Sequence, residues 1–195
     1  MDTLTQELMR ELSGERLTQM SRQIGADEQA TSSVLTAAMP LLVSALANNT
    51  SQPSGAQSLH QALVEDHDGS ILNNLPSFLG NPQSANGAGI LEHVLGGQQS
   101  VVTQGLSEGS GLNSDQVRML LQIVAPLILG ALGKQQQQQG FDSSDLSIFL
   151  GGQKEMDQQS NPDLMSLLNN LLDMDRDGSA LDDIFGMLGK LFGRK

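Results

Sequence analysis

Apolar residues recur every three or four positions near the start of the chain, a spacing that places them on one face of a helix. They are Leu4, Leu8, Leu12, Leu17, Met20 and Ile24. Ser13 and Gly14 interrupt the pattern, and Gly25 follows its last member. Because glycine commonly ends helices, the pattern predicts two short amphipathic helices.

Two longer apolar segments lie deeper in the chain, at residues 34–47 and 119–132. Both are shorter than the ~20 residues that span a bilayer, and both are apolar nearly all round, which is typical of buried helices. Asp27 is a suitable N-cap for the first. Each segment contains a proline, Pro40 or Pro126, which costs ~3 kcal/mol inside a helix and kinks it. The segments predict two central, proline-kinked helices in an all-α fold.

The two segments also share a register. Asp27 corresponds to Asn113 and Pro40 to Pro126, with an offset of 86 residues in both pairs. An Asx cap and an internal proline at one offset favour an internal duplication. Small residues follow each proline, Gly130 among them, and we expect them to let the two central helices approach closely.

Composition divides the chain into three parts. We expect a duplicated helical domain at residues 1–152 and a flexible, polar linker at residues 153–163. Residues 164–195 then hold an aspartate-rich loop and an amphipathic C-terminal helix. Aromatic residues make up only 3% of the chain, which also favours helices over sheets.

Charge and motifs exclude several functions. The 22 acidic and 10 basic residues give a net charge of -12, which repels phosphate backbones, so we expect no nucleic-acid partner. The chain has no cysteine, and it shows neither a nucleophile elbow nor a phosphate-binding glycine loop after a strand. We therefore expect no enzyme activity and no catalytic residues. The three histidines, His60, His67 and His93, are more typical of structural positions than of a metal site.

Several motifs occur together and in a fixed order. They are AAMPLLVSALANN, HDGSILNNLPSFLG, GAGILEHVLGG, QIVAPLILGALGK and DMDRDGSALDD. In these motifs the sequence resembles a YidB-like bacterial family, domain of unknown function 937. The resemblance implies a small α-helical bacterial protein without an established activity. The N-terminus lacks an apolar run followed by a cleavage site, and we expect a cytoplasmic protein.

The tail segment DMDRDGSALDDI resembles a calcium-binding loop of the EF-hand type, in which oxygen ligands alternate and a glycine makes the central turn. Its candidate ligands are Asp173, Asp175, Asp177, Ser179, Asp182 and Asp183. Ile184 stands where such a loop has a bidentate glutamate. Alternatively, these aspartates only stabilise the start of the next helix, by ~0.3 to 1 kcal/mol each.

The last twelve residues, IFGMLGKLFGRK, combine an apolar helical face with the cations Lys190, Arg194 and Lys195. Such a helix binds a partner groove or an anionic membrane surface, or packs on its own domain. The sequence thus indicates a noncatalytic interaction module, with Ca²⁺ as candidate ligand and a protein as partner. The alternative is a peripheral membrane or envelope-associated factor. The oligomeric state stays open.

Overall fold

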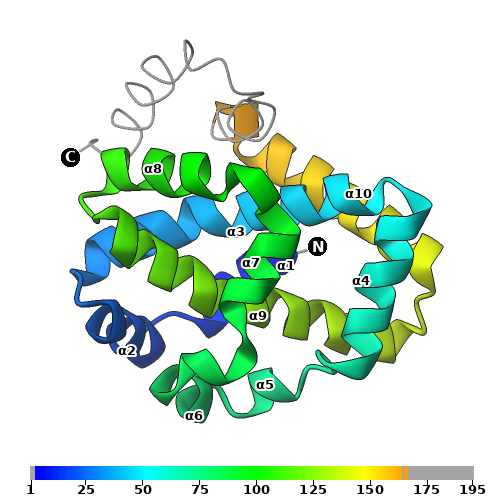
Figure 1. Cartoon of the computed structure of the whole chain (residues 1–195), viewed down its shortest axis with the longest axis horizontal. Coiled ribbons are helices and arrows are strands. Elements are labelled where there is room, and N and C mark those ends of the chain that lie inside the picture. Colours follow the sequence, from blue (N-terminus) through cyan, green and yellow to red (C-terminus); the bar gives the residue numbers. More distant parts are fainter. Residues whose placement is uncertain (1–2, 164, 167–195) are drawn as a thin grey trace.

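The computed structural model describes residues 3–163 and 165–166, and in this part every regular element is a helix (Figure 1). The predicted all-α class is therefore confirmed. The α-helices are α1 (Leu4–Glu11), α2 (Glu15–Ile24), α3 (Glu28–Thr50), α4 (Pro53–Glu65), α5 (Ser70–Asn73), α6 (Leu75–Gly80), α7 (Gly87–Leu95), α8 (Gln99–Ser110), α9 (Ser114–Gln139) and α10 (Ser143–Ser160). Two short 3₁₀ helices, η1 (Pro82–Ala85) and η2 (Gly96–Gln98), flank α7.

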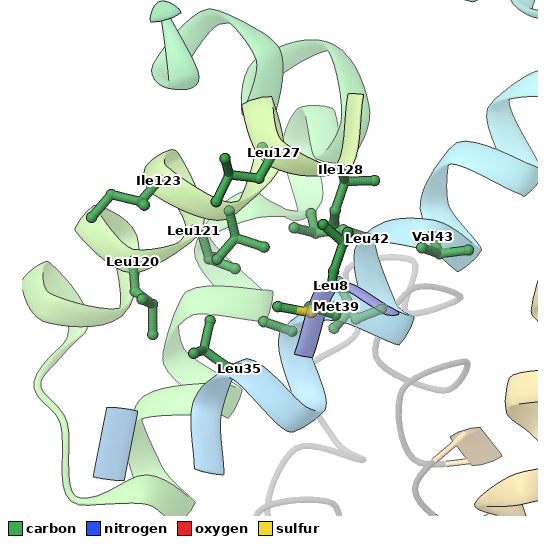
Figure 2. Packing of buried hydrophobic residues seen from close by; sticks show 14 of the residues in the cluster. Leu8, Leu35, Met39, Leu42, Val43, Leu120, Leu121, Ile123, Leu127 and Ile128 are labelled. Atoms are coloured by element: carbon green, nitrogen blue, oxygen red, sulfur yellow. The ribbon is translucent and has the colours of Figure 1, made fainter. Parts of the chain in front are cut away.

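The core is built around α3 and α9, which pack against each other and are surrounded by the shorter helices (Figure 1). Met39 and Leu42 of α3 lie in one apolar cluster with Leu121 and Ile128 of α9 (Figure 2). Both helices have the length and composition to cross a membrane, but 78% of the apolar window of each is buried inside the fold. This burial agrees with the central helices that the sequence predicts.

Each central helix begins at its expected cap, Asp27 or Asn113, and continues through its proline. The Asp27 carboxylate accepts hydrogen bonds from two backbone amides of the first turn, and the Asn113 carboxamide accepts one. These bonds satisfy donors that a helix start leaves unpaired. The kinks at the prolines and the internal duplication remain predictions from the sequence.

The structure corrects the predicted linker, because α10 continues to Ser160 through most of residues 153–163. Gln153 and Asp157 are buried on one face of this helix. The Gln153 side-chain oxygen accepts a hydrogen bond from the Leu4 amide at 2.7 Å, and the Thr5 hydroxyl donates to Asp157 at 2.8 Å. Polar residues that suggested a flexible segment thus hold the start of α1 against α10.

The small residues of α9 also serve a different contact from the expected one. A Cβ at Gly130 would meet the Ile71 side chain, and a Cβ at Gly133 would meet the backbone carbonyl of His67. These glycines therefore accommodate the segment between α4 and α6. The expectation that Gly130 serves the approach of α3 to α9 was wrong, because the pattern identifies a small residue but not its neighbour.

Candidate functional site

Residues 66–90 surround an open pocket of about 660 Å³. They connect the end of α4 to the first turn of α7 through α5, α6 and η1, with α5 and α6 at the lower edge of the view in Figure 1. The polar residues that line the pocket are Asp66, His67, Asp68, Ser70, Asn74, Ser77, Asn81, Ser84 and Asn86. Ile71, Phe78 and Ile90 add apolar surface.

This segment is held on the rest of the domain by close backbone contacts with α9 and by buried apolar residues. The His67 carbonyl lies against Gly133, and Gly87 lies against the Gln122 carbonyl, so neither glycine has room for a Cβ. Leu75 and Leu79 of α6 are buried in the core. The position of the pocket walls therefore depends on apolar packing and on glycines, whose lack of a side chain permits the close backbone contacts.

Three asparagines occupy equivalent places around the pocket. Asn74 joins α5 to α6, Asn81 joins α6 to η1, and Asn86 joins η1 to α7. Asparagine is among the best N-cap residues because its side chain accepts a hydrogen bond from the first turn of a helix. None of these three makes such a bond. Their exposed carboxamides line the pocket instead.

Asn86 also has an unusual backbone conformation. Its φ of 49° is the one positive φ of a residue other than glycine in the described part of the chain. Asparagine tolerates this left-handed region better than most residues do, but it still costs conformational energy. The turn before α7 therefore keeps an asparagine where glycine would be less strained.

His67 is half-buried at the pocket wall. Burial lowers the pKa of its imidazole, although the nearby charge of Asp66 opposes the shift. Since an imidazole ordinarily titrates near pH 6.5, His67 is neutral at pH 7. A neutral imidazole offers one hydrogen-bond donor and one acceptor.

The two carboxylates of the pocket have different surroundings. The Ser70 side chain and backbone hydrogen-bond to Asp68 and lower the pKa of its carboxyl group, and the Ser70 amide lies 2.9 Å from Asp68 Oδ1. This hydrogen bond stabilises the turn that precedes α5. Asp66 is exposed. The lining residues include no lysine or arginine, so the pocket is acidic and disfavours anions.

The residues singled out in the sequence are not gathered at this pocket. The candidate calcium ligands Asp173, Asp175, Asp177, Ser179, Asp182 and Asp183 lie outside the described residues. Of the histidines, only His67 lines the pocket. His60 contacts the Phe141 carbonyl and the Gln136 amide, and His93 contacts the Gly89 carbonyl. Among residues 3–163 and 165–166, no three His, Asp or Glu side chains are grouped to hold a metal ion.

The pocket asparagines were missed when the sequence was read for charged and metal-binding residues. A sequence signal exists for two of them, because proline is favoured in the first turn of a helix. Pro76 lies two positions after Asn74, and Pro82 directly follows Asn81. Three helix starts within 13 residues, from 74 to 86, place three carboxamides in a small region.

One protein family matches the chain. Its profile, described as "Bacterial protein of unknown function (DUF937)", matches residues 6–135, which is more than half of the sequence and includes the whole pocket segment. No curated protein and no solved structure matches the chain.

Proposed function

The chain belongs to this bacterial family of unknown function, and from that premise we propose that it is a noncatalytic binding module. Its helical domain holds a ligand in the pocket of residues 66–90. The observation that carries the proposal is the convergence of three N-cap asparagines whose side chains cap no helix. A pocket with several convergent polar groups is the default site for a ligand.

Binding is a better proposal than catalysis because a serine nucleophile needs a base within hydrogen-bond reach. Ser70, Ser77 and Ser84 line the pocket together with His67. The Ser84 hydroxyl donates to the Asn81 carbonyl at 2.8 Å. Among the hydrogen bonds of the described residues, none joins a serine hydroxyl to a histidine. The lining groups are suited to hold a ligand, and no pair of them is arranged to activate a nucleophile.

The proposal is tested by nuclear magnetic resonance on the ¹⁵N-labelled full chain. Five probes are added separately: a neutral saccharide, a diamine, inorganic phosphate, a nucleoside and a short uncharged peptide. We expect at least one probe to shift backbone amides of residues 66–90 saturably, with smaller shifts in the first two turns of α3. The double variant Asn74→Ala, Asn81→Ala should weaken that response. No saturable shift with any probe would contradict the proposal.

We further propose that the tail is a second interaction element. Asp173, Asp175 and Asp177 alternate as calcium ligands do, and Ca²⁺ would neutralise them and order the following helix. Calorimetric titration of the metal-stripped chain with Ca²⁺ should release heat that Asp175→Ala, Asp177→Ala abolishes. Mg²⁺ is the control. Heat no larger than dilution, without a change in circular dichroism, would leave the aspartates only the role of starting a helix.

A second candidate function uses the same tail at a membrane. The apolar face of IFGMLGKLFGRK and its terminal cations support a peripheral, envelope-associated role. The chain should then float with vesicles that contain anionic lipid and remain in solution with neutral vesicles. Removal of residues 184–195 should abolish flotation. Equal flotation without that segment would contradict this role.

A further inference from the structure

We infer that the pocket of residues 66–90 binds a neutral saccharide. The inference rests on the proposed binding function and adds the chemical class of the ligand. It follows from three properties of the pocket walls: their charge, their unused hydrogen-bonding groups and their apolar patch.

Charge excludes acidic ligands. Asp66 and Asp68 line the pocket, His67 is uncharged at pH 7, and the lining set has no lysine or arginine. Lys134 packs behind Gly69, but it lines a separate cavity that also contains Glu7 and Glu11. A phosphate or carboxylate would therefore meet acceptors without a compensating cation.

The same carboxylates do not make the pocket a strong cation site. Both aspartates are exposed, and exposed ion pairs in water contribute little. Asp68 already accepts hydrogen bonds from Ser70. The described residues also group no third carboxylate or histidine with them for a metal ion. The hydrogen-bonding groups, which outnumber the charges, therefore determine the ligand class.

The unused groups come in donor and acceptor pairs. Each carboxamide of Asn74, Asn81 and Asn86 supplies two N–H donors and one carbonyl acceptor, and the neutral imidazole of His67 supplies one of each. The hydroxyl of Ser77, also at the wall, is donor and acceptor at once. A sugar hydroxyl has the same dual character, so neighbouring hydroxyls on one ring can pair with a single carboxamide.

The apolar patch and the volume fit the same ligand. Ile71, Phe78 and Ile90 line the pocket beside the polar groups, and the C–H faces of a sugar ring are apolar. The volume of about 660 Å³ is within the range of roughly 300 to 1,000 Å³ for small-molecule sites. An extended peptide is less well matched, because peptide recognition generally uses a sheet edge or a long groove. The walls here come from short helices around an open pocket.

The test uses the folded, ¹⁵N-labelled full chain. Glucose, galactose, N-acetylglucosamine and cellobiose are titrated separately, with 1,4-diaminobutane, inorganic phosphate, adenosine and tetraglycine as probes of other classes. We expect saturable shifts of amides in residues 66–90 with at least one saccharide and none with phosphate. The double variant Asn74→Ala, Asn81→Ala should weaken that binding about tenfold or more, because it removes two hydrogen-bonding side chains.

The matched control is Asn73→Ala. Asn73 is an exposed neighbour of Asn74 but lines the cavity between α1, α5 and α9, so its loss should leave saccharide affinity within about twofold of the parent protein. Unchanged melting by circular dichroism verifies that each variant is folded. If only probes of the other classes shift residues 66–90, the saccharide inference is overturned while the binding function stands. If no probe shifts them, both are overturned.

Discussion

The three longest helices of the described chain and the short helices around the pocket begin in opposite ways. Asp27, Asn113 and Asp142, at the starts of α3, α9 and α10, all accept hydrogen bonds from backbone amides of the first turn. Asn74, Asn81 and Asn86 stand at the same kind of position and accept none. The Asn113 carboxamide thus stabilises a helix start, whereas the carboxamides of the three pocket asparagines lie at the pocket wall without capping a helix.

The difference shows how the pocket segment is stabilised. Side-chain caps contribute to the long helices, whereas the segment of residues 66–90 depends on close contact with α9 and on buried apolar residues. Because the carboxamides of Asn74, Asn81 and Asn86 make no capping bond, we expect them to be replaceable without loss of the fold. Residues that bind ligands often contribute little to stability or reduce it.

The largest effect is expected where the segment meets α9. In Gly133→Ala the new methyl group would collide with the His67 carbonyl, and overpacking of this kind costs ~1 to 3 kcal/mol or more. Urea denaturation should show this loss in the free energy of unfolding. The control is Gly151→Ala in α10, where a Cβ meets nothing within 4 Å and helix propensity favours alanine by ~1 kcal/mol. Equal stability of the two variants would contradict the close contact.

Substitution of the helix caps should give the next largest loss of stability. It also gives the clearest contrast with substitution of the pocket asparagines. Asn113→Ala and Asp142→Ala should each lose ~0.5 to 2 kcal/mol of unfolding free energy, because each leaves backbone amides unpaired. Asn74→Ala and Asn81→Ala should change it by less than ~0.5 kcal/mol, as surface substitutions usually do. An equal loss of unfolding free energy in the pocket variants and the cap variants would contradict this difference between the two regions.

A smaller effect concerns Asp157, a buried polar residue that serves the fold. Burial raises the pKa of its carboxyl group, although hydrogen bonds from the Thr5 and Thr3 side chains lower it. The native state therefore holds the proton more tightly than the unfolded chain, whose aspartate titrates near pH ~3.9. Ionisation of Asp157 thus costs stability at neutral pH, and this cost disappears as the pH falls through the native pKa.

The variant Asp157→Asn should lack this pH-dependent cost, because a carboxamide does not titrate. Its oxygen can still accept a hydrogen bond from the Thr5 hydroxyl. The stability of the parent protein relative to the variant should therefore rise as the pH falls from 7 towards 4. Urea denaturation at several pH values measures this difference. The pH dependence that other carboxylates, including Asp68, give to the stability is the same in both proteins and therefore cancels in this difference. A difference that is constant with pH would contradict the burial of an ionisable carboxylate.

The smallest effect is expected at Asn86. Glycine accepts the φ of 49° without steric strain, so Asn86→Gly should keep the unfolding free energy within ~0.5 kcal/mol of the parent. The variant nevertheless removes a pocket carboxamide and should weaken ligand binding. A large loss of stability on thermal or urea denaturation would instead assign the Asn86 side chain a structural role.

The sequence predicted the parts of the fold that local patterns determine. Apolar periodicity and the caps Asp27 and Asn113 located the central helices, because these signals lie within a few residues of the structure that they specify. The end of α10 was missed because Gln153 and Asp157 look solvent-exposed until their partners on α1, about 150 residues away in sequence, are known. The pocket was missed for a related reason, since the sequence shows a capping residue but not whether its side chain caps.

The most direct test of saccharide binding at the pocket observes the carboxamides themselves. The side-chain NH₂ signals of Asn74, Asn81 and Asn86 are followed in the full chain during saccharide titration, with Asn113 as an internal reference. We expect the three pocket signals to move together with one dissociation constant while the Asn113 signal stays in place, because the Asn113 carboxamide oxygen accepts a hydrogen bond from the Gln116 backbone amide. Pocket signals that stay still through the titration, or move no more than that of Asn113, would contradict saccharide binding at the pocket.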